Sequence, residues 1–442
     1  MNVLKIGQKK KVQNAWAMYD WANSVYSLVI TSTIFPVYFN SVTKSEEYGD
    51  VVSFFGFRIV NTVLYSYSIS FSFLVIALIS PLLSGMADYG GKKLLFMKIF
   101  AYLGSTACLG LFFFDGDNLE YGIICAVLAS IGYAGSIVFY NAFLPEIATE
   151  DEFDFLSARG FALGYIGSVI LLILNLFMIQ SPETFGLSDG GDAARWSFLI
   201  TGIWWAGFAQ IPFKYLPDNP YNRKVKSALF LKGYREINKI FKIVRKTKVM
   251  HRFLAAFFFY SMGVQTVMYL AATFGDKELG LPGDKLIITI LIIQIVAIGG
   301  SYLFAYISKL YGNKISLVIM VFVWVLICGA AYYVVSEYQF YALAFVVGMV
   351  MGGIQSLSRS TYSKLIPVET TQHASYFSFY DVTEKLAVVL GTFSYGVIEQ
   401  ITGNMRNSSL ALGLFFFVGL GFLLLLRIPK QDFQTIVEIK NA

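Results

Sequence analysis

The chain has 442 residues, of which 56% are hydrophobic and 14% are charged, and its formal net charge is +6. An average soluble domain is about 25% charged, so this composition argues against a soluble globular protein of this size. The aromatic share of 17% suits lipid-facing helices with aromatic belts at the two membrane interfaces.

Reactive side chains are few and scattered. Cys108, Cys125 and Cys328 all lie inside apolar runs, and His251 and His373 stand apart from them. Such spacing offers no disulfide framework, metal site or Ser-His catalytic set. We therefore expect no enzyme activity, no metal and no cofactor. The polar, basic segment 1–14 precedes an apolar run that is too long for a cleavable signal peptide, so we expect that run to remain as an anchor.

A helix needs about 20 residues to cross a bilayer. The sequence contains twelve stretches that approach this length and have no Asp, Glu, Lys or Arg. In chain order they are 21–43, 59–87, 99–114, 121–145, 160–182, 196–213, 253–275, 286–308, 315–336, 338–358, 386–398 and 407–426. The run 386–398 reaches span length only if it is extended backward through charged residues. The sequence therefore predicts an all-α polytopic membrane protein with twelve transmembrane helices, one of which brings charge into the membrane.

Loop charges predict the orientation of these spans. With both termini on one side, that side carries most of the 34 lysines and arginines, and cytoplasmic loops are the ones enriched in these residues. We expect both termini in the cytoplasm. The absence of a targeting peptide favours the plasma membrane of a bacterium.

Two short segments recur about half a chain apart. DYGGKK at 88–93 is echoed by KLYGNK at 309–314, and FYNAFLPE at 139–146 by STYSKLIP at 360–367. This predicts six helices duplicated in parallel, as units 1–215 and 251–442, around a linker at 216–250.

The linker is basic and carries an apolar stripe at helical spacing, formed by Phe230, Tyr234, Ile237, Phe241 and Val244. We expect a helix that lies on the anionic cytoplasmic leaflet. A regulatory or partner-binding segment is the alternative, and nucleic acid is not an expected partner.

Two six-helix halves with a DxxGKK loop resemble the major facilitator superfamily. Asp88, Gly91, Lys92 and Lys93 match the superfamily loop, whereas Ser84 and Tyr89 depart from it. The resemblance implies that this loop is a cytoplasmic gate, whose carboxylate bonds to a neighbouring helix N-terminus in one state and releases it in the other.

Longer strings resemble a narrower family. They are YDWANSVY (19–26), FYNAFLPEIA (139–148), SARGFALGYIGS (157–168), GGIQSLSRSTYSKLIP (352–367) and FSFYDVTEKLAVVLGTFSYG (377–396). Together they are similar to the "unknown major facilitator" family, which includes autophagy-related vacuolar amino-acid effluxers. The resemblance implies transport by alternating access, but it indicates the substrate only loosely.

Charges inside the bilayer are candidates for coupling, because each costs about 2.5–3.5 kcal/mol or more unless it is paired or wetted. Arg359 in span 10 and Asp381, Glu384 and Lys385 in span 11 predict one buried ionic network, acting either as a coupling switch or as a fixed structural pair. Asp381 and Lys385 have the i, i+4 spacing of one helix face.

In the first half, Asp20 and Arg159 are expected near the cytoplasmic edge. Asp20 is a candidate for a solute amine or a proton, although a helix N-terminal carboxylate is the slightly favoured interpretation. Arg159 is assigned to the coupling network.

Polar residues in apolar spans complete the predicted binding site. We expect Asp20, Asn23, Tyr140, Asn141, Gln265 and Gln355 to contact solute, because transporters with repeats bind at the interface between them. Interhelical hydrogen bonding is the alternative explanation for such residues.

The predicted function is secondary active transport of a small solute by a monomer, with a proton or the solute's own gradient as the driving force. Amino acids are the preferred solute, both because the family resemblance implies them and because acidic and basic groups lie near the spans, and a zwitterion needs one of each. A sugar, drug or organic-ion facilitator of the same fold is the alternative, and a membrane assembly factor without transport is the remote one.

Overall fold

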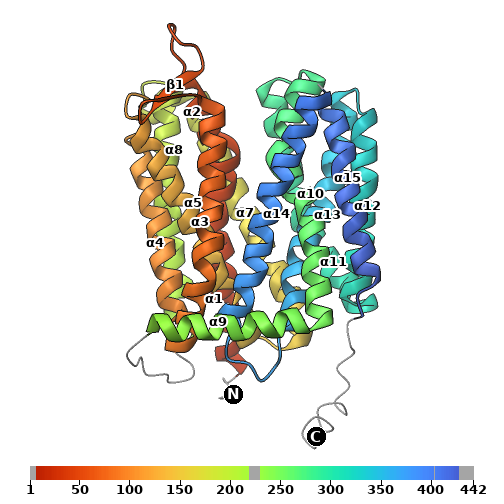
Figure 1. Ribbon diagram of the computed structural model, residues 1–442. Helices are drawn as coiled ribbons and strands as arrows, with labels where there is room; N and C mark the ends of the chain where they lie inside the picture. Colours follow the sequence, from red (N-terminus) through yellow and green to blue (C-terminus); the bar gives the residue numbers. More distant parts are fainter. Residues whose placement is uncertain (1–5, 219–228, 403, 428–442) are drawn as a thin grey trace, which may run out of the picture.

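The computed structural model describes residues 6–218, 229–402 and 404–427, and it is built almost entirely from helices. Figure 1 shows two groups of upright helices side by side, with α9 (Leu229–Lys246) lying across one end and a short hairpin projecting from the other. We call the end that carries α9 the linker end and the opposite one the far end.

The first group contains the helices that precede α9. They are α1 (Ile6–Val25), which continues through a π-helical stretch (Tyr26–Thr33) into α2 (Ile34–Val42), then α3 (Asn61–Gly90), α4 (Lys93–Leu111), α5 (Leu119–Asn141), α6 (Leu144–Ile147), α7 (Phe153–Gln180) and α8 (Gly190–Tyr215). The hairpin pairs β1 (Val51–Phe54) with β2 (Phe57–Val60) antiparallel, with Val51 opposite Val60. Two single 3-10 turns, Glu150–Glu152 and Pro182–Phe185, flank α7.

The second group contains the helices that follow α9. They are α10 (Lys248–Leu279), α11 (Gly283–Tyr311), α12 (Asn313–Tyr333), α13 (Glu337–Leu365), α14 (His373–Thr402) and α15 (Met405–Leu424).

Within the described residues, ten helices are long and apolar enough to cross a membrane. The two other predicted spans, 196–213 and 386–398, fall in α8 and α14, which are helices of 26 and 30 residues. The all-α architecture is confirmed, and ten of the twelve expected spans are supported by length and composition. The total of twelve transmembrane helices stays a prediction.

Helix α1 begins well before the first predicted span. The apolar run was expected to start at Trp21, but the helix starts at Ile6. A charged residue ends an apolar run but does not by itself end a helix, because helix propensities of charged residues differ from that of alanine by only about 0.7 kcal/mol or less. Asp20 consequently lies several turns inside the helix and is buried.

Helix α9 is amphipathic, as its stripe predicts, but its apolar side meets protein. Ile237, Ile240 and Val244 are buried, and α9 packs on α3, α10 and α14. Ile237 and Val244 belong to the predicted stripe, so the expectation that the stripe lies on lipid is wrong for these two residues. The side chain of Phe230 lies outside the described residues. Tyr234 and Phe241 of the stripe remain exposed.

The two groups meet through a small set of helices. Helix α3 packs against α14, and α7 packs against α11 and α13. These helices, together with α1, α5 and α10, surround the region where the predicted site residues lie.

Candidate functional site

A cavity of about 130 Å³ lies between the two helix groups. Its lining brings together predicted site residues from both halves: Asp20, Asn141, Gln265, Gln355, Arg359, Glu384 and Lys385. Aromatic residues that the sequence analysis did not single out complete the wall, including Phe161, Tyr133, Tyr260, Tyr269 and Tyr380. The cavity is therefore polar and aromatic, and it draws on both groups.

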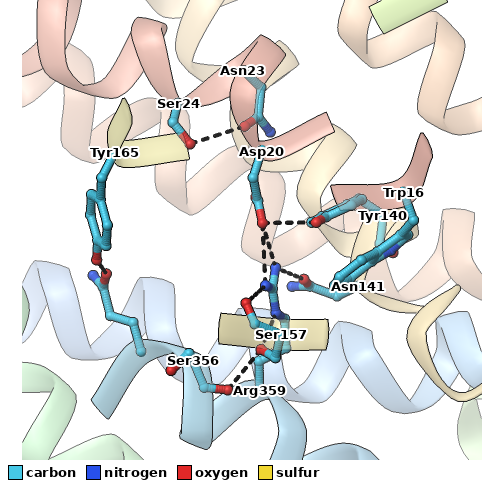
Figure 2. Close-up of polar contacts among 11 residues, drawn as sticks. Trp16, Asp20, Asn23, Ser24, Tyr140, Asn141, Ser157, Tyr165, Ser356 and Arg359 are labelled. Carbon is cyan, nitrogen blue, oxygen red and sulfur yellow. Dashed lines mark hydrogen bonds and ion pairs between the residues drawn. The ribbon is translucent and has the colours of Figure 1, made fainter. Parts of the chain in front are cut away.

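Arg359 of α13 crosses into the first group and pairs with Asp20 of α1 (Figure 2). Its two terminal nitrogens each lie 3.2 Å from Asp20 Oδ2. The same carboxylate oxygen accepts a hydrogen bond of 2.8 Å from the Tyr140 hydroxyl. Both charged side chains are almost fully buried, so each one compensates the other inside the protein.

Three further contacts hold the guanidinium. Nε donates to Ser157 Oγ at 2.9 Å, and one terminal nitrogen donates to the Ser157 carbonyl at 2.9 Å. The other terminal nitrogen donates to Asn141 Oδ1 at 3.3 Å. The planar guanidinium fork is thus matched by acceptors on several sides, an arrangement that arginine satisfies and lysine does not.

A second charged cluster lies on α14. Lys385 Nζ is 3.1 Å from Glu384 Oε2 and 3.4 Å from Asp381 Oδ1. Gln265 of α10 donates to Glu384 Oε1 at 3.2 Å. The i, i+4 pair that the spacing predicts is present.

The expected single network joining Arg359 to Asp381, Glu384 and Lys385 is wrong. The structure divides it in two, because Arg359 faces α1 across the interface and takes its carboxylate from Asp20. Spans 10 and 11 follow each other in the chain, but this does not determine which helix lies opposite a given side chain.

Four other predictions need correction. Arg159 is exposed and donates to Asn14 Oδ1 at 2.5 Å, so it belongs to neither cluster. Asp20 is not a helix N-terminal carboxylate, since α1 begins at Ile6. Asn23 is buried beside Ser24, whose hydroxyl donates to its Oδ1 at 3.4 Å, and it does not line the cavity. Tyr140 lies behind Asp20 and contacts it instead of the cavity.

The predicted gate loop makes the contact that the superfamily resemblance implies. Asp88 accepts hydrogen bonds from the backbone N–H groups of Ala374 and Ser375, at 3.2 and 2.7 Å, in the first turn of α14. A carboxylate is favourable there because helix N-termini carry unsatisfied N–H groups and positive dipole charge. Gly91 ends α3 with φ +66°, a left-handed conformation that glycine adopts without strain.

The two lysines of this loop differ. Lys93 is buried and pairs with Glu146, which also lies 2.9 Å from Nδ1 of His373 in α14. Lys92 is exposed, as an ordinary basic loop residue would be. Glu146 therefore links Lys93 of this loop to His373 of the second group.

Sequence reasoning missed a second connection between the groups. Asp154 at the start of α7 accepts hydrogen bonds from Asn313 Nδ2 at 2.8 Å, Ser308 Oγ at 3.0 Å and Lys364 Nζ at 2.8 Å. Asp154 follows an acidic loop and resembles a solvated charge in the sequence. Asn313 and Lys364, however, lie in the two echoed segments, which was a usable signal.

These connections share one location. The bonds of Asp88, Glu146, Asp154 and Asp20 all lie toward the linker end, and Tyr165 OH donates to Gln355 Oε1, at 2.5 Å, nearer the middle of the helices. Contacts described between the groups thus hold the linker end closed.

Comparison with known proteins identifies the family. The family described as "Vacuole effluxer Atg22 like" matches residues 8–434. The chain belongs to this Atg22-like family. It is 30% identical over 434 residues to the uncharacterized MFS-type transporter YxiO of Bacillus subtilis (strain 168), covering 98% of each chain. It is also 23% identical to autophagy-related protein 22-1 of Penicillium rubens, covering 89% of this chain and 80% of the relative.

Solved structures agree on the fold. The proton:xylose symporter XylE superposes with a TM-score of 0.70 at 15% identity, covering 95% of both chains. The fucose transporter FucP, solved in the outward conformation, has a TM-score of 0.68 at 13% identity, covering 96% of this chain and 99% of its own. This Atg22-like chain is therefore a multi-pass membrane transporter of the major facilitator type and not an enzyme, as the sequence predicts.

Proposed function

We propose that this Atg22-like transporter is a secondary active carrier of a small zwitterion of the amino-acid class. The observation that carries the proposal is the interface cavity, whose wall contains both acids and bases, namely Asp20 and Glu384 with Arg359 and Lys385. Buried charges are expensive in a membrane protein unless paired. A solute with one positive and one negative group can exchange places with these partners and keep every charge compensated.

The position of the cavity agrees with a solute site. It lies between the two helix groups and takes polar side chains from both, as in transporters that bind at the interface between repeats. The matching family is described as a vacuole effluxer, and efflux from a vacuole delivers solute to the cytoplasm, so transport is to be measured in both directions.

Alternating access would proceed by rocking of residues 1–215 against 251–442. In the described conformation the groups are bonded at the linker end, so the opposite conformation requires these bonds to break. We place the linker end in the cytoplasm because the basic residues gather at that end. The similarity to YxiO of Bacillus subtilis supports a bacterial plasma membrane. A proton or the solute's own gradient supplies the direction.

A neutral polar solute, such as a sugar, is the second candidate. Tyr133, Tyr260, Tyr269 and Gln355 line the same cavity, and aromatic faces with hydroxyl and amide groups also suit a sugar. In that case the charged clusters would serve stability alone.

Counterflow in proteoliposomes tests the proposal. Vesicles loaded with a pool of unlabelled amino acids, dipeptides or sugars receive labelled members of each class, with a pH dye inside. Uptake of an amino acid, lost in protein-free vesicles, supports the zwitterion carrier, and matching proton movement supports coupling. Uptake of a sugar without any amino acid would refute the proposed solute class and leave the transporter fold intact.

A further inference from the structure

Among the described residues, every hydrogen-bond partner of the Arg359 guanidinium belongs to the first helix group. Asp20 lies on α1, Asn141 ends α5 and Ser157 lies on α7, whereas Arg359 lies on α13. Figure 2 shows the guanidinium at the centre of this set, with the Asp20 carboxylate and the Asn141 amide directed toward it. The first group therefore holds all of the acceptors and the second group contributes only the cation.

Aromatic rings of the first group enclose the same cation. The centroid of the Phe161 ring lies 4.2 Å from Arg359 Cζ, that of Trp16 lies 4.8 Å away and that of Tyr140 lies 5.3 Å away. Trp16 and Tyr140 are stacked at 4.5 Å, and Trp16 Nε1 donates to the Tyr140 carbonyl at 2.9 Å. Rings fixed in this way around a carboxylate form the kind of cage that recognises organic cations.

We call this set the guanidinium cage: Trp16, Asp20, Tyr140, Asn141, Ser157 and Phe161. Helix α7 comes close enough to complete it because residue 160 is glycine. A Cβ at Gly160 would lie 2.4 Å from Asp20 Oδ2 and 3.0 Å from an Arg359 nitrogen. Asp20, Asn141 and Phe161 also line the central cavity, so the cage adjoins the space through which a solute passes.

We propose that the guanidinium cage is the binding site for the cationic group of the transported solute, and that Arg359 occupies it as a tethered competitor while the linker end is closed. This inference rests on the proposed function and adds to it the group that is recognised and the moment of recognition. A guanidinium fits best, because its planar donors match the acceptors that now hold Arg359. A primary ammonium uses the carboxylate and the ring faces.

The exchange would couple binding to gating. Separation of the groups at the linker end withdraws α13, and Arg359 with it, from the cage. A solute cation that enters from that end then takes the vacated site, and Arg359 returns only after the cation has moved from the cage into the adjoining cavity, whose wall includes Glu384. Two cations cannot share one carboxylate in a buried site without a large electrostatic penalty.

Chemical rescue of an emptied cage tests the inference. The variant Arg359→Gln, purified in detergent, is heated with increasing guanidinium chloride in the low millimolar range, with sodium chloride matching the ionic strength. Lys364→Gln is the matched control, because Lys364 lies on the same helix and pairs across the interface with Asp154. We expect guanidinium, and L-arginine in a second series, to raise the Tm of Arg359→Gln by roughly 1–3 °C at about ten times the dissociation constant. Wild type and Lys364→Gln should not shift.

The double variant Arg359→Gln with Asp20→Asn should not respond, because its cage has lost the carboxylate. An equal shift, or none, in Arg359→Gln and Lys364→Gln would overturn the inference. Recovery of folded Arg359→Gln only when guanidinium is present during purification would support it. Failure to recover that variant even with guanidinium, while Lys364→Gln is recovered, would count against it.

The transport assay separates the two proposals. Wild-type uptake of a zwitterion together with an unresponsive cage would remove the cage inference alone. A responsive cage in a protein that carries no amino acid would remove the proposed solute class alone.

Discussion

Asp88 at the end of α3 accepts a hydrogen bond of 2.7 Å from the backbone N–H of Ser375, which lies 287 residues later in the first turn of α14. The contact joins the two helix groups at the linker end. A second one, from Asp154 to Lys364 at 2.8 Å, joins them at α7 and α13. Both acids are on the first group, but they differ in what they leave behind: release of Asp88 leaves neutral N–H groups on α14, whereas release of Asp154 leaves the Lys364 ammonium without its carboxylate.

Removing the Asp88 carboxylate should favour opening of the linker end. Asp88→Ala leaves two N–H groups of α14 without their acceptor, and hydrogen bonds to a charged group contribute about 1.5–3 kcal/mol, equivalent to roughly tenfold or more in the open population. A cysteine placed at buried Thr361 should react faster with an impermeant maleimide added at the linker end. Cys108, Cys125 and Cys328 are buried and should stay silent.

Asp50→Ala is the matched control for this measurement, because Asp50 is an exposed acid near the far end that lies 3.7 Å from Lys44. Equal labelling rates in the two variants would show that Asp88 does not hold the gate.

Exchanging the charges of Asp154 and Lys364 should restore the stability and transport that a change at Asp154 alone removes. Asp154→Lys sets two ammonium groups together and should lower both the Tm and the rate of counterflow, whereas Asp154→Lys with Lys364→Asp should recover much of each. Double-variant coupling of this kind isolates a pairwise interaction. Glu337→Lys is the control, because Glu337 pairs with Lys285 at 2.7 Å within one group. This variant should change stability without changing the labelling of Thr361→Cys.

Neutralising Glu384 should separate transport from its driving force. In Glu384→Gln the carboxylate that pairs with Lys385 at 3.1 Å becomes an amide of similar shape, so the cavity keeps its size. We expect counterflow to persist and uptake driven by a pH gradient to fall by about an order of magnitude or more, the scale set by the loss of one protonatable group. Uptake that stays fully proton-dependent would remove Glu384 from the coupling scheme.

A methyl group at Gly85 should displace α9. Its Cβ would lie 2.3 Å from the carbonyl oxygen of Gly233 in α9, and overpacking of this kind typically costs about 1–3 kcal/mol. We expect a lower Tm for Gly85→Ala in detergent. Gly207→Ala, where nothing lies within 4 Å of the added Cβ, should match or slightly exceed the wild-type Tm because alanine favours helix. A Tm for Gly85→Ala at or above that of the control would contradict the close crossing of α3 and α9.

Features that depend on local spacing were predictable. The apolar runs located the helices, and the i, i+4 spacing of Asp381 and Lys385 placed both on one face, where the structure finds them 3.4 Å apart. Asp88 was assigned to a helix N-terminus from the superfamily pattern, and the acceptor–donor contact exists. Helix α9 was recognised from its apolar stripe, although the protein surface that covers this stripe was not predicted.

Residue spacing did not predict which buried charges pair across the interface. Arg359 was assigned to the acids of α14, its neighbour in the chain, but its carboxylate is on α1, 339 residues away. Asp154 was overlooked because an acid beside a loop is most often solvated, and only the approach of Asn313 and Lys364 shows otherwise.

The sequence by itself determined the solvent, the helices and the family of this protein, because hydropathy and helical period are properties of neighbouring residues and a bilayer requires about 20 apolar residues for each span. Only the tertiary structure decided which charges compensate each other. Burial makes an unpaired charge costly, so each buried ion takes the partner that helix packing sets opposite it, and that choice depends on the arrangement of two helix groups whose contacting residues lie hundreds of positions apart.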